Sequence, residues 1–170
     1  MAAEVAGVPV AGIWVRQSRA NLRGDQAAAY SARWQSAGIP AVYFADREAT
    51  AWVELYRGLA ERRIGPGDVF PRDLHYVRVA LERAADLSTE KARSALGLPR
   101  IRQTSLQWPS FQAVGEQLVA EGAQGILYSS AARTRSLCRC VFEAGLPGLR
   151  IEGEAVRVLA PPPLPRGLRT

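Results

Sequence analysis

The sequence predicts a single-domain α+β (mixed α/β) fold in which helices flank a mixed sheet. Strand-like and helix-like patterns alternate along the 170 residues, a length that suits one continuous core. No Gly-rich phosphate loop separates a strand from a helix, which argues against P-loop and Rossmann folds. A content of 48% hydrophobic and 22% charged residues is typical of a globular chain rather than a disordered one.

The first half predicts two strands and a helix. "VAGIWVR" (10–16) is strand-like and places Arg16 at a strand end, facing a polar loop. "IPAVYFA" (39–45) predicts a second strand, and Asp46 is the expected N-cap of a helix over 47–63. Helical spacing gives that helix one apolar face, made by Trp52, Leu55, Tyr56 and Leu59.

The second half begins with a predicted strand and two helices. After a turn-rich connection, "LHYVRVAL" (74–81) reads as a strand. Short and longer helices should follow over 88–97 and 108–122, ended by Gly97 and Gly122.

Four further strands complete the expected order. An apolar strand within 124–133 runs into Ser129 and Ser130, so that two hydroxyls lie at a strand end. "SLCRCVFE" (136–143) alternates like a strand, and 148–160 predicts a terminal strand pair that turns near Gly153.

The domain boundaries follow from composition. We expect an N-terminal extension over residues 1–9, one domain over 10–160, and an extended, mobile Pro-rich tail over 161–170.

The net charge of +6 is almost wholly due to arginine, since Lys91 is the only lysine. Arginine suits phosphate and other anions, although a general surface bias is the preferred interpretation for most of these residues. Direct nucleic-acid binding is disfavoured because the chain has no Lys/Arg block, zinc finger or RNA-binding signature.

The cysteines predict neither a disulfide framework nor a metal site. Cys138 and Cys140 are separated by one residue, and the only histidine, His75, lies far from them in the sequence. Buried thiols in a reducing compartment fit best. The N-terminus lacks a basic leader and no stretch has the roughly 18 apolar residues of a membrane span, so we expect a cytoplasmic protein.

Glu54 lies off the apolar face of its helix, and its neighbours one turn away are small: Thr50, Ala51 and Gly58. Small neighbours would allow a ligand or strand to approach the carboxylate closely. Alternatively Glu54 is solvated and pairs with Arg57. Periodicity alone favours this second interpretation.

Three stretches together resemble the RES domain, a family of bacterial toxins paired with helix-turn-helix antitoxins of the Xre type. They are "GIWVR", "SARWQSAGIPAVYFADREATAWVE" and "GAQGILYSSAAR". Within them lie an Arg-Trp-polar element, a Gly-x-Pro-x-x-Tyr strand, an Ala-x-x-Glu helix and a Gly-x-x-Gly-Ile strand that runs into Ser. The resemblance covers residues 10–160 and rests on the order and spacing of these elements, since no single motif is specific.

The resemblance implies a fold related to ADP-ribosyltransferases and breakage of the nicotinamide–ribose bond of NAD, with phosphate or water as acceptor. NAD would be a substrate, and no cofactor or metal is implied. By position, the functional residues would be Arg16, Arg33, Tyr43, Glu54 and Ser130.

The chain also departs from the family pattern. Ser129 stands where relatives often have proline, so the choice between Ser129 and Ser130 stays open. Gln17 and Gln35 replace the aromatic and Asn residues that are common after the two arginines. These departures would affect ribose contacts or efficiency more readily than the reaction class.

The residue types suit this chemistry. Loss of nicotinamide builds positive charge on the ribose, which Glu54 would stabilise. Arg16 and Arg33 would grip the pyrophosphate, or one of them an incoming phosphate. Tyr43 would pack against nicotinamide or ribose, and Ser130 would bond the ribose or position the nucleophile. The structural alternatives are that Tyr43 is an ordinary core residue and that Ser130 caps the turn after its strand.

The leading hypothesis from the sequence is therefore an NAD-degrading toxin, an NAD phosphorylase or glycohydrolase, that an Xre-type antitoxin neutralises. A protein ADP-ribosyltransferase shares the first step and predicts a labelled protein. A non-catalytic basic binding module predicts salt-dependent binding that is indifferent to Glu54, and an inactive relative is a fourth option. Homo-oligomers and toxin–antitoxin hetero-oligomers both stay open.

Overall fold

Runs of buried residues in the central strands build a sheet that closes on itself around an apolar interior. The computed structural model describes residues 8–168. Within this range the elements are, in chain order, β1 (Val8–Arg19), β2 (Ala41–Ala45), α1 (Glu48–Glu61), the 3-10 helix η1 (Pro66–Val69), β3 (Arg72–Leu87), α2 (Glu90–Ala95), η2 (Ser105–Gln107), α3 (Trp108–Ala120), β4 (Gly125–Ser129), β5 (Leu137–Phe142), η3 (Glu143–Gly148) and β6 (Leu149–Val158).

The sheet has the strand order β1-β2-β5-β4-β3-β6, and β1 also pairs with β3. Five strands therefore form a closed ring. β6 pairs with residues 72–79 of β3, while β4 pairs with residues 84–87 of the same strand. The β3–β4 pair is parallel and the other pairs are antiparallel, which confirms the predicted mixed sheet with helices at its faces.

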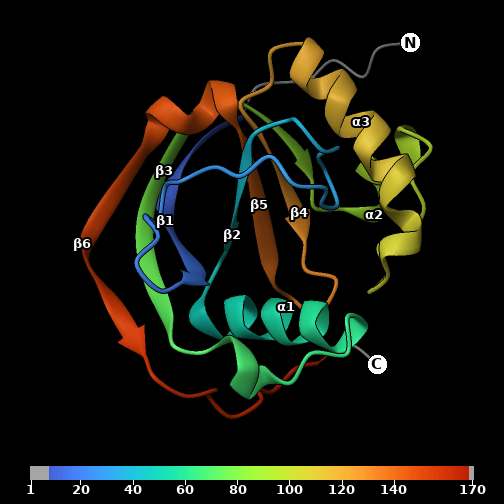
Figure 1. Ribbon diagram of the computed structural model, residues 1–170. Helices are drawn as coiled ribbons and strands as arrows, with labels where there is room; N and C mark the ends of the chain where they lie inside the picture. The colour runs from blue at the N-terminus through green and yellow to red at the C-terminus, as the bar shows by residue number, and fades with distance from the viewer. Residues whose placement is uncertain (1–7, 169–170) are drawn as a thin grey trace.

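Helices cover two outer faces of this ring (Figure 1). α1 lies across one end of the strands and packs Trp52, Leu55 and Leu59 against Val15 and Leu74. α3 lies beside β4 and β5, where its residues Phe111 and Leu118 share a core with the buried Trp34 and both cysteines. The interior is filled by a third cluster, made mainly by Trp14, Val42, Phe44, Val77, Val79, Leu81 and Val141.

The start of α1 differs from the prediction. The N-cap is Arg47, which makes no side-chain cap bond. Asp46 instead accepts a hydrogen bond from Thr50 Oγ1 at 2.7 Å and one from the Leu137 backbone N–H at 3.2 Å. The Asp46 carboxylate therefore bonds to the start of β5 instead of capping the helix. The predicted apolar face is confirmed, with Trp52, Leu55 and Leu59 buried.

Two strand predictions were also wrong in extent. β1 continues to Arg19, so Arg16 lies within the strand rather than at its end. The predicted C-terminal strand pair is one strand, β6, and Gly153 has a φ of +70° at an irregularity in its pairing with β3. Gly153 forms a bulge rather than a hairpin turn, because β3 supplies partners on both sides of it.

The Pro-rich tail is extended but not loose over residues 161–168. Tyr56 Oη donates to the Pro162 carbonyl at 2.6 Å, and the Thr134 backbone N–H donates to the Gly167 carbonyl at 2.9 Å. Residues 1–7 of the expected N-terminal extension lie outside the described residues. None of the helices within residues 8–168 has the length and apolar character needed to cross a membrane.

Candidate active site

Glu54 projects from α1 toward the end of β4 and the start of β5. Its Oε1 accepts a hydrogen bond from Ser130 Oγ at 2.5 Å and a longer one from the Ala132 backbone N–H at 3.4 Å. Cys138 Sγ lies 3.7 Å from the same oxygen. The half-buried carboxylate is thus held by the loop between β4 and β5, not by the Arg57 side chain that periodicity favoured as its partner. Arg57 donates to the Gln103 carbonyl at 3.0 Å.

All of these contacts fall on Oε1, and among residues 8–168 no hydrogen bond reaches Glu54 Oε2. One carboxylate oxygen is fixed while the other keeps its acceptor capacity.

Ser130 is the serine that meets Glu54. Its hydroxyl donates to the carboxylate and accepts from the backbone N–H groups of Ala132 (3.1 Å) and Arg133 (2.9 Å). The Ser129 hydroxyl donates instead to the Ser88 carbonyl. Side chains alternate at a strand end, so only one of two adjacent serines can face α1. Of the two serines that the sequence left open, Ser130 is the one that bonds Glu54.

Tyr43 lies on β2 with its ring half-buried and its hydroxyl against the segment that carries Arg33. Tyr43 Oη accepts a hydrogen bond from the Trp34 backbone N–H at 3.2 Å. Burial and the nearby Cys140 raise the pKa of this phenol well above its ordinary value, so the hydroxyl stays protonated. Trp34 itself belongs to the core, since it is fully buried against the rings of Phe111 and Tyr128.

Arg33 extends over α3. Its Nη2 donates to the Arg102 carbonyl at 2.9 Å, and its guanidinium lies 5.3 Å from the centre of the Phe111 ring. Its Nη1 is buried without a hydrogen-bond partner among the described residues. A buried donor without an acceptor is costly, so this atom is ready to bind an oxygen of a ligand.

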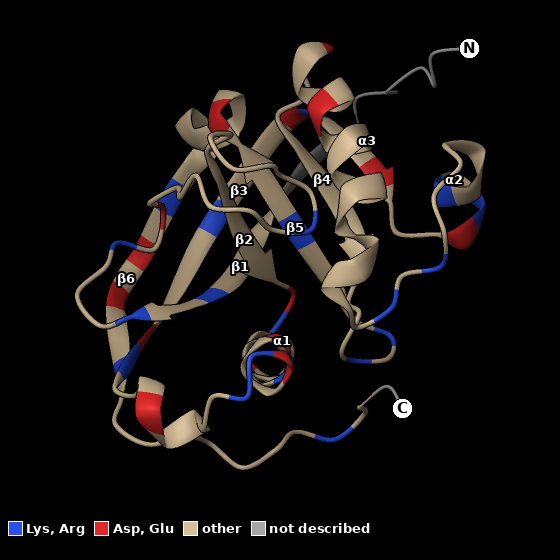
Figure 2. Ribbon diagram, turned by 45° about the vertical axis from the view of Figure 1, so that its right-hand side comes forward, with Lys and Arg blue, Asp and Glu red and all other residues tan. Residues whose placement is uncertain are grey.

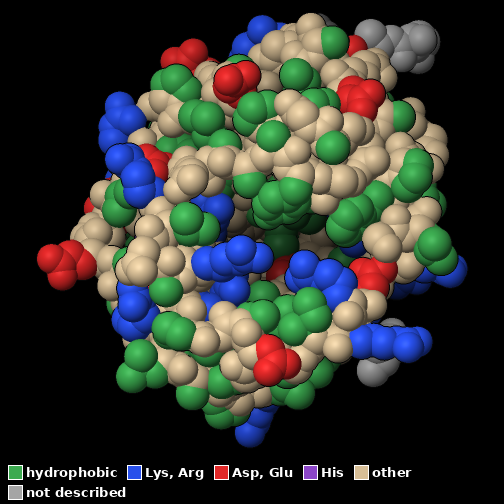
Figure 3. Space-filling view, viewed as in Figure 1, with side chains coloured by type: hydrophobic (Ala, Val, Ile, Leu, Met, Phe, Trp, Pro, Cys, Tyr) green, Lys and Arg blue, Asp and Glu red, His purple; other side chains and the backbone are tan. Residues whose placement is uncertain are grey.

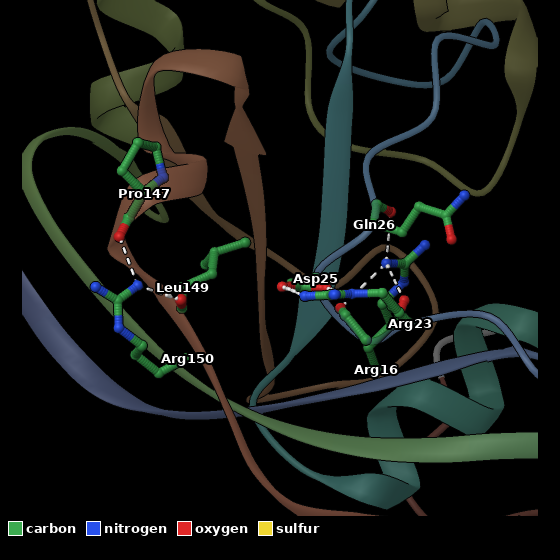
Figure 4. Close-up of polar contacts among 8 residues, drawn as sticks. Arg16, Arg23, Asp25, Gln26, Pro147, Leu149 and Arg150 are labelled. Carbon is green, nitrogen blue, oxygen red and sulfur yellow. Dashed lines mark hydrogen bonds and ion pairs between the residues drawn. The ribbon is translucent and has the colours of Figure 1, made fainter.

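Arg16 is not bonded to this group. Its Nη1 donates to the carbonyls of Gly24 (3.1 Å) and Gln26 (2.7 Å), which closes the loop after β1 (Figure 4). Burial lowers its pKa, while the charges of Tyr30 and Asp25 act in the opposite direction. Within residues 8–168, no hydrogen bond joins Arg16 to Glu54, Ser130 or Arg33.

A cavity of about 220 Å³ adjoins Ser130. Its walls are Glu90, Arg93, Arg100, Ile101, Ser129 and Ser130. The sequence reasoning named neither arginine, and no signal could have found them, since one lies on a six-residue helix and the other on a loop.

Figure 3 shows Lys and Arg side chains on both sides of a hollow in the face above α1. This face therefore suits an anionic ligand.

The family model for the RES domain matches residues 10–159. The chain belongs to the RES domain family. A probable NAD(+) phosphorylase of Mycobacterium tuberculosis is 32% identical over 132 residues, which make up 77% of this RES-domain chain. The chain spans 62% of the length of that curated relative.

A solved structure, the MbcT–MbcA toxin–antitoxin complex of M. tuberculosis, contains a chain with the same fold. The match has a TM-score of 0.77 and 22% sequence identity, and it covers 89% of this chain and 86% of that one.

Proposed function

We propose that this RES-domain protein degrades NAD by breaking the nicotinamide–ribose bond, with phosphate or water as the acceptor. The observation that carries the proposal is the 2.5 Å hydrogen bond from Ser130 Oγ to Glu54 Oε1. It unites two residues that are 76 positions apart and that the family resemblance assigned separately to the reaction. The name of the M. tuberculosis relative points to the same chemistry.

Glu54 would stabilise the transition state. As the bond to nicotinamide breaks, its electron pair leaves with the ring nitrogen and positive charge grows on the ribose. The negative carboxylate lowers the energy of that charge, and Oε2 is free to accept a ribose hydroxyl. Ser130 fixes the carboxylate through Oε1, so the charge needs no reorientation during the reaction.

The arginines would hold the two negative charges of the substrate's pyrophosphate. Arg33 is the stronger candidate because its buried Nη1 has no acceptor among residues 8–168. Arg16 shapes the loop after β1 and would assist by its charge. Tyr43 would present its half-buried ring to the nicotinamide or ribose while its hydroxyl holds the segment of Arg33 in place.

The test is nicotinamide release from NAD by the purified protein, with and without inorganic phosphate. Glu54→Gln removes the charge but keeps the shape, and the rate should fall on the order of a hundredfold or more. Glu48→Gln makes the same chemical change on the same helix, where the carboxylate accepts from Tyr76 Oη, and should leave the rate unchanged.

Release that requires phosphate would indicate a phosphorylase, and release without phosphate a hydrolase. Radiolabel on a protein would favour protein ADP-ribosylation. No release by the folded protein would overturn the proposal.

The biological role we propose is that of a toxin acting in the cytoplasm and neutralised by an antitoxin, of the Xre helix-turn-helix type as the family resemblance implies. The shared fold with a chain of a toxin–antitoxin complex is consistent with this role. Expression of the wild-type chain should arrest growth, expression of Glu54→Gln should not, and a neighbouring helix-turn-helix protein should restore growth.

A further inference from the structure

The loop between β4 and β5 carries Ser130 and is closed by its own hydrogen bonds. The Ser130 backbone N–H donates to the Ser136 carbonyl at 2.8 Å. The Ser130 hydroxyl accepts from the backbone N–H groups of Ala132 (3.1 Å) and Arg133 (2.9 Å). These bonds shape the loop but do not fix its position relative to α1. The contact between Ser130 and Glu54 therefore depends on what holds the loop against the helix.

The Arg133 side chain joins this loop to α1. Its Nη1 donates to Ser136 Oγ at 2.9 Å and to Thr50 Oγ1 at 3.4 Å. Thr50 is fully buried on α1, one turn before Glu54, and residues spaced four apart lie on the same face of a helix. The guanidinium thus bridges from the Ser130 loop to the face of α1 that presents Glu54.

Other bonds hold the far end of the loop or end on Glu54 itself. At the start of β5, the Asp46 backbone N–H donates to the Leu137 carbonyl at 3.0 Å, and the Leu137 backbone N–H donates to Asp46 Oδ2 at 3.2 Å. Ser130 and Ala132 both donate to Glu54. Within residues 8–168, the bond from Arg133 is the one that ties residues 130–136 to α1 without using the Glu54 carboxylate.

The C-terminal tail supports Arg133 from the other side. Arg133 Nε donates to the Arg166 carbonyl at 3.1 Å, and the Thr134 backbone N–H donates to the Gly167 carbonyl at 2.9 Å. Figures 1 and 2 both show this tail passing below α1, on the side away from β4 and β5. The Arg133 guanidinium therefore contacts three segments: the loop, the helix and the tail.

These contacts fix the position of the guanidinium without neutralising it. Its three acceptors are neutral oxygens, two from hydroxyls and one from a carbonyl. No ion pair joins Arg133 to a carboxylate in the described part of the chain. A planar guanidinium presents its donors in a fixed fork, so acceptors on three segments set its place closely. A lysine ammonium, which is one compact charge on a flexible stem, does not reproduce that fork.

We propose that Arg133 is a positioning residue: its guanidinium holds the Ser130 loop against α1 and so keeps the Ser130 hydroxyl on Glu54. The proposal rests on the proposed function for its catalytic consequence. The Arg133 side chain makes no hydrogen bond to Glu54 within residues 8–168 and does not line the cavity beside Ser130. It therefore acts through Ser130 and not on the substrate. A displacement of about 1 Å in such a group is enough to slow a reaction strongly.

The first test measures the hold on the loop and needs no catalysis. Hydrogen exchange of the full chain is followed by mass spectrometry. In Arg133→Gln, residues 130–136 should exchange about fivefold faster than in the wild type, as expected for loss of one buried hydrogen bond. Arg135→Gln is the matched control, because Arg135 is exposed on the same loop and its side chain makes no hydrogen bond among the described residues. Equal exchange in all three proteins would overturn the proposal.

The second test separates positioning from charge. For nicotinamide release, Arg133→Gln should lower kcat about tenfold and change the KM for NAD less than about twofold. Arg133→Lys keeps the charge but not the fork, so its kcat should stay low, while Arg135→Gln should match the wild type. Full recovery of kcat in Arg133→Lys would show that charge alone suffices and would contradict the positioning role.

The third test asks whether Arg133 acts through Ser130. In a chain that already carries Ser130→Ala, Arg133→Gln should lower kcat no further, since the hydroxyl that it positions is gone. A second tenfold loss would show independent action and refute the proposal. A folded wild type that releases no nicotinamide would instead refute the proposed function, and hydrogen exchange would still decide whether Arg133 holds the loop.

Discussion

His75 is the only histidine of the chain, and it is buried on β3 beneath the loop that follows β1. Its Nε2 lies 3.0 Å from Ser18 Oγ. Gly24 presses against it so closely that a Cβ there would lie 2.7 Å from the His75 Cβ. The loop that Arg16 closes therefore depends on a neutral, tightly packed imidazole.

This burial predicts a pH-dependent stability. Burial, followed by the charge of Arg16, lowers the pKa of His75 below its ordinary value of 6.5, while the charges of Asp73 and Asp25 raise it by less. The unfolded chain therefore takes up the proton first as pH falls. The stability that neutral His75 contributes is fully present above pH 6.5 and is lost progressively as pH falls through the lowered pKa.

Urea unfolding between pH 8 and pH 5 measures this effect. The free energy of unfolding should decline toward pH 5 in the wild type and much less in His75→Asn. Asp73 and Asp25 stay ionised in this window, since hydrogen bonds from Arg157 and Arg23 lower their pKa values. An equal decline in both proteins would assign the pH dependence to other groups.

At the scale of residues, sequence reasoning named two residues that the structure brings into contact, but it did not predict the partners of the arginines. Glu54 and Ser130 were named from the order of family elements, and they are hydrogen-bonded. Arg16 and Arg33 were expected to act together, yet each donates to the carbonyls of a different loop. Which carbonyl an arginine side chain reaches depends on how the loops pack. Local sequence patterns do not predict this packing.

Among the elements, the close packing of α3 against the segment of Trp34 depends on a glycine. Gly115 faces Trp34, and a Cβ at this position would lie 2.0 Å from the Trp34 carbonyl oxygen. The close approach lets α3 seal the core around Trp34, the residue next to Arg33.

Gly115→Ala should therefore destabilise the fold by about 1–3 kcal/mol, since the helix or the Trp34 backbone must move. The displaced segment carries Arg33, so nicotinamide release should fall as well. Gly67→Ala on η1 is the control, because an added Cβ there meets nothing within 4 Å. Urea unfolding of both variants checks the prediction, and equal stabilities would show that α3 adapts without cost.

Helix and strand patterns were predictable where one face is buried. The apolar spacing of α1 predicted its packing face correctly, because Trp52, Leu55 and Leu59 all pack in one cluster with residues of β1 and β3. The N-cap and the course of β6 were not predictable. The Asp46 carboxylate accepts a hydrogen bond from the Leu137 backbone N–H, and the pairing of β6 with β3 makes Gly153 a bulge. In both cases the local structure depends on a strand that is distant in the sequence.

For the molecule as a whole, the tail ties two parts of the domain together. Pro162 accepts from Tyr56 on α1, and the carbonyls of Arg166 and Gly167 accept from Arg133 Nε (3.1 Å) and the Thr134 backbone N–H (2.9 Å). The last two donors belong to the β4–β5 loop, which begins at Ser130.

Removal of residues 161–170 should lower the free energy of unfolding by about 2 kcal/mol, as expected for loss of a few hydrogen bonds. Tyr56→Phe in the full chain should cost about 1 kcal/mol, and in the shortened chain it should cost nothing further. Chemical denaturation of the four proteins tests this pattern. Additive losses would mean that the Tyr56 hydroxyl stabilises the fold without the tail.

The closed ring of strands also sets when the Glu54–Ser130 pair can form during synthesis of the chain. β2 ends at Ala45 but pairs along its length with β5, which ends at Phe142. Glu54 likewise bonds to Ser130, which follows it by 76 positions. Closing such long loops costs conformational entropy, which is offset only when the late strands pair. A ribosome that has made the first two thirds of the chain therefore carries the carboxylate without its partner. The Glu54–Ser130 pair forms only when β4 and the loop that follows it emerge, so a prematurely ended chain lacks this contact.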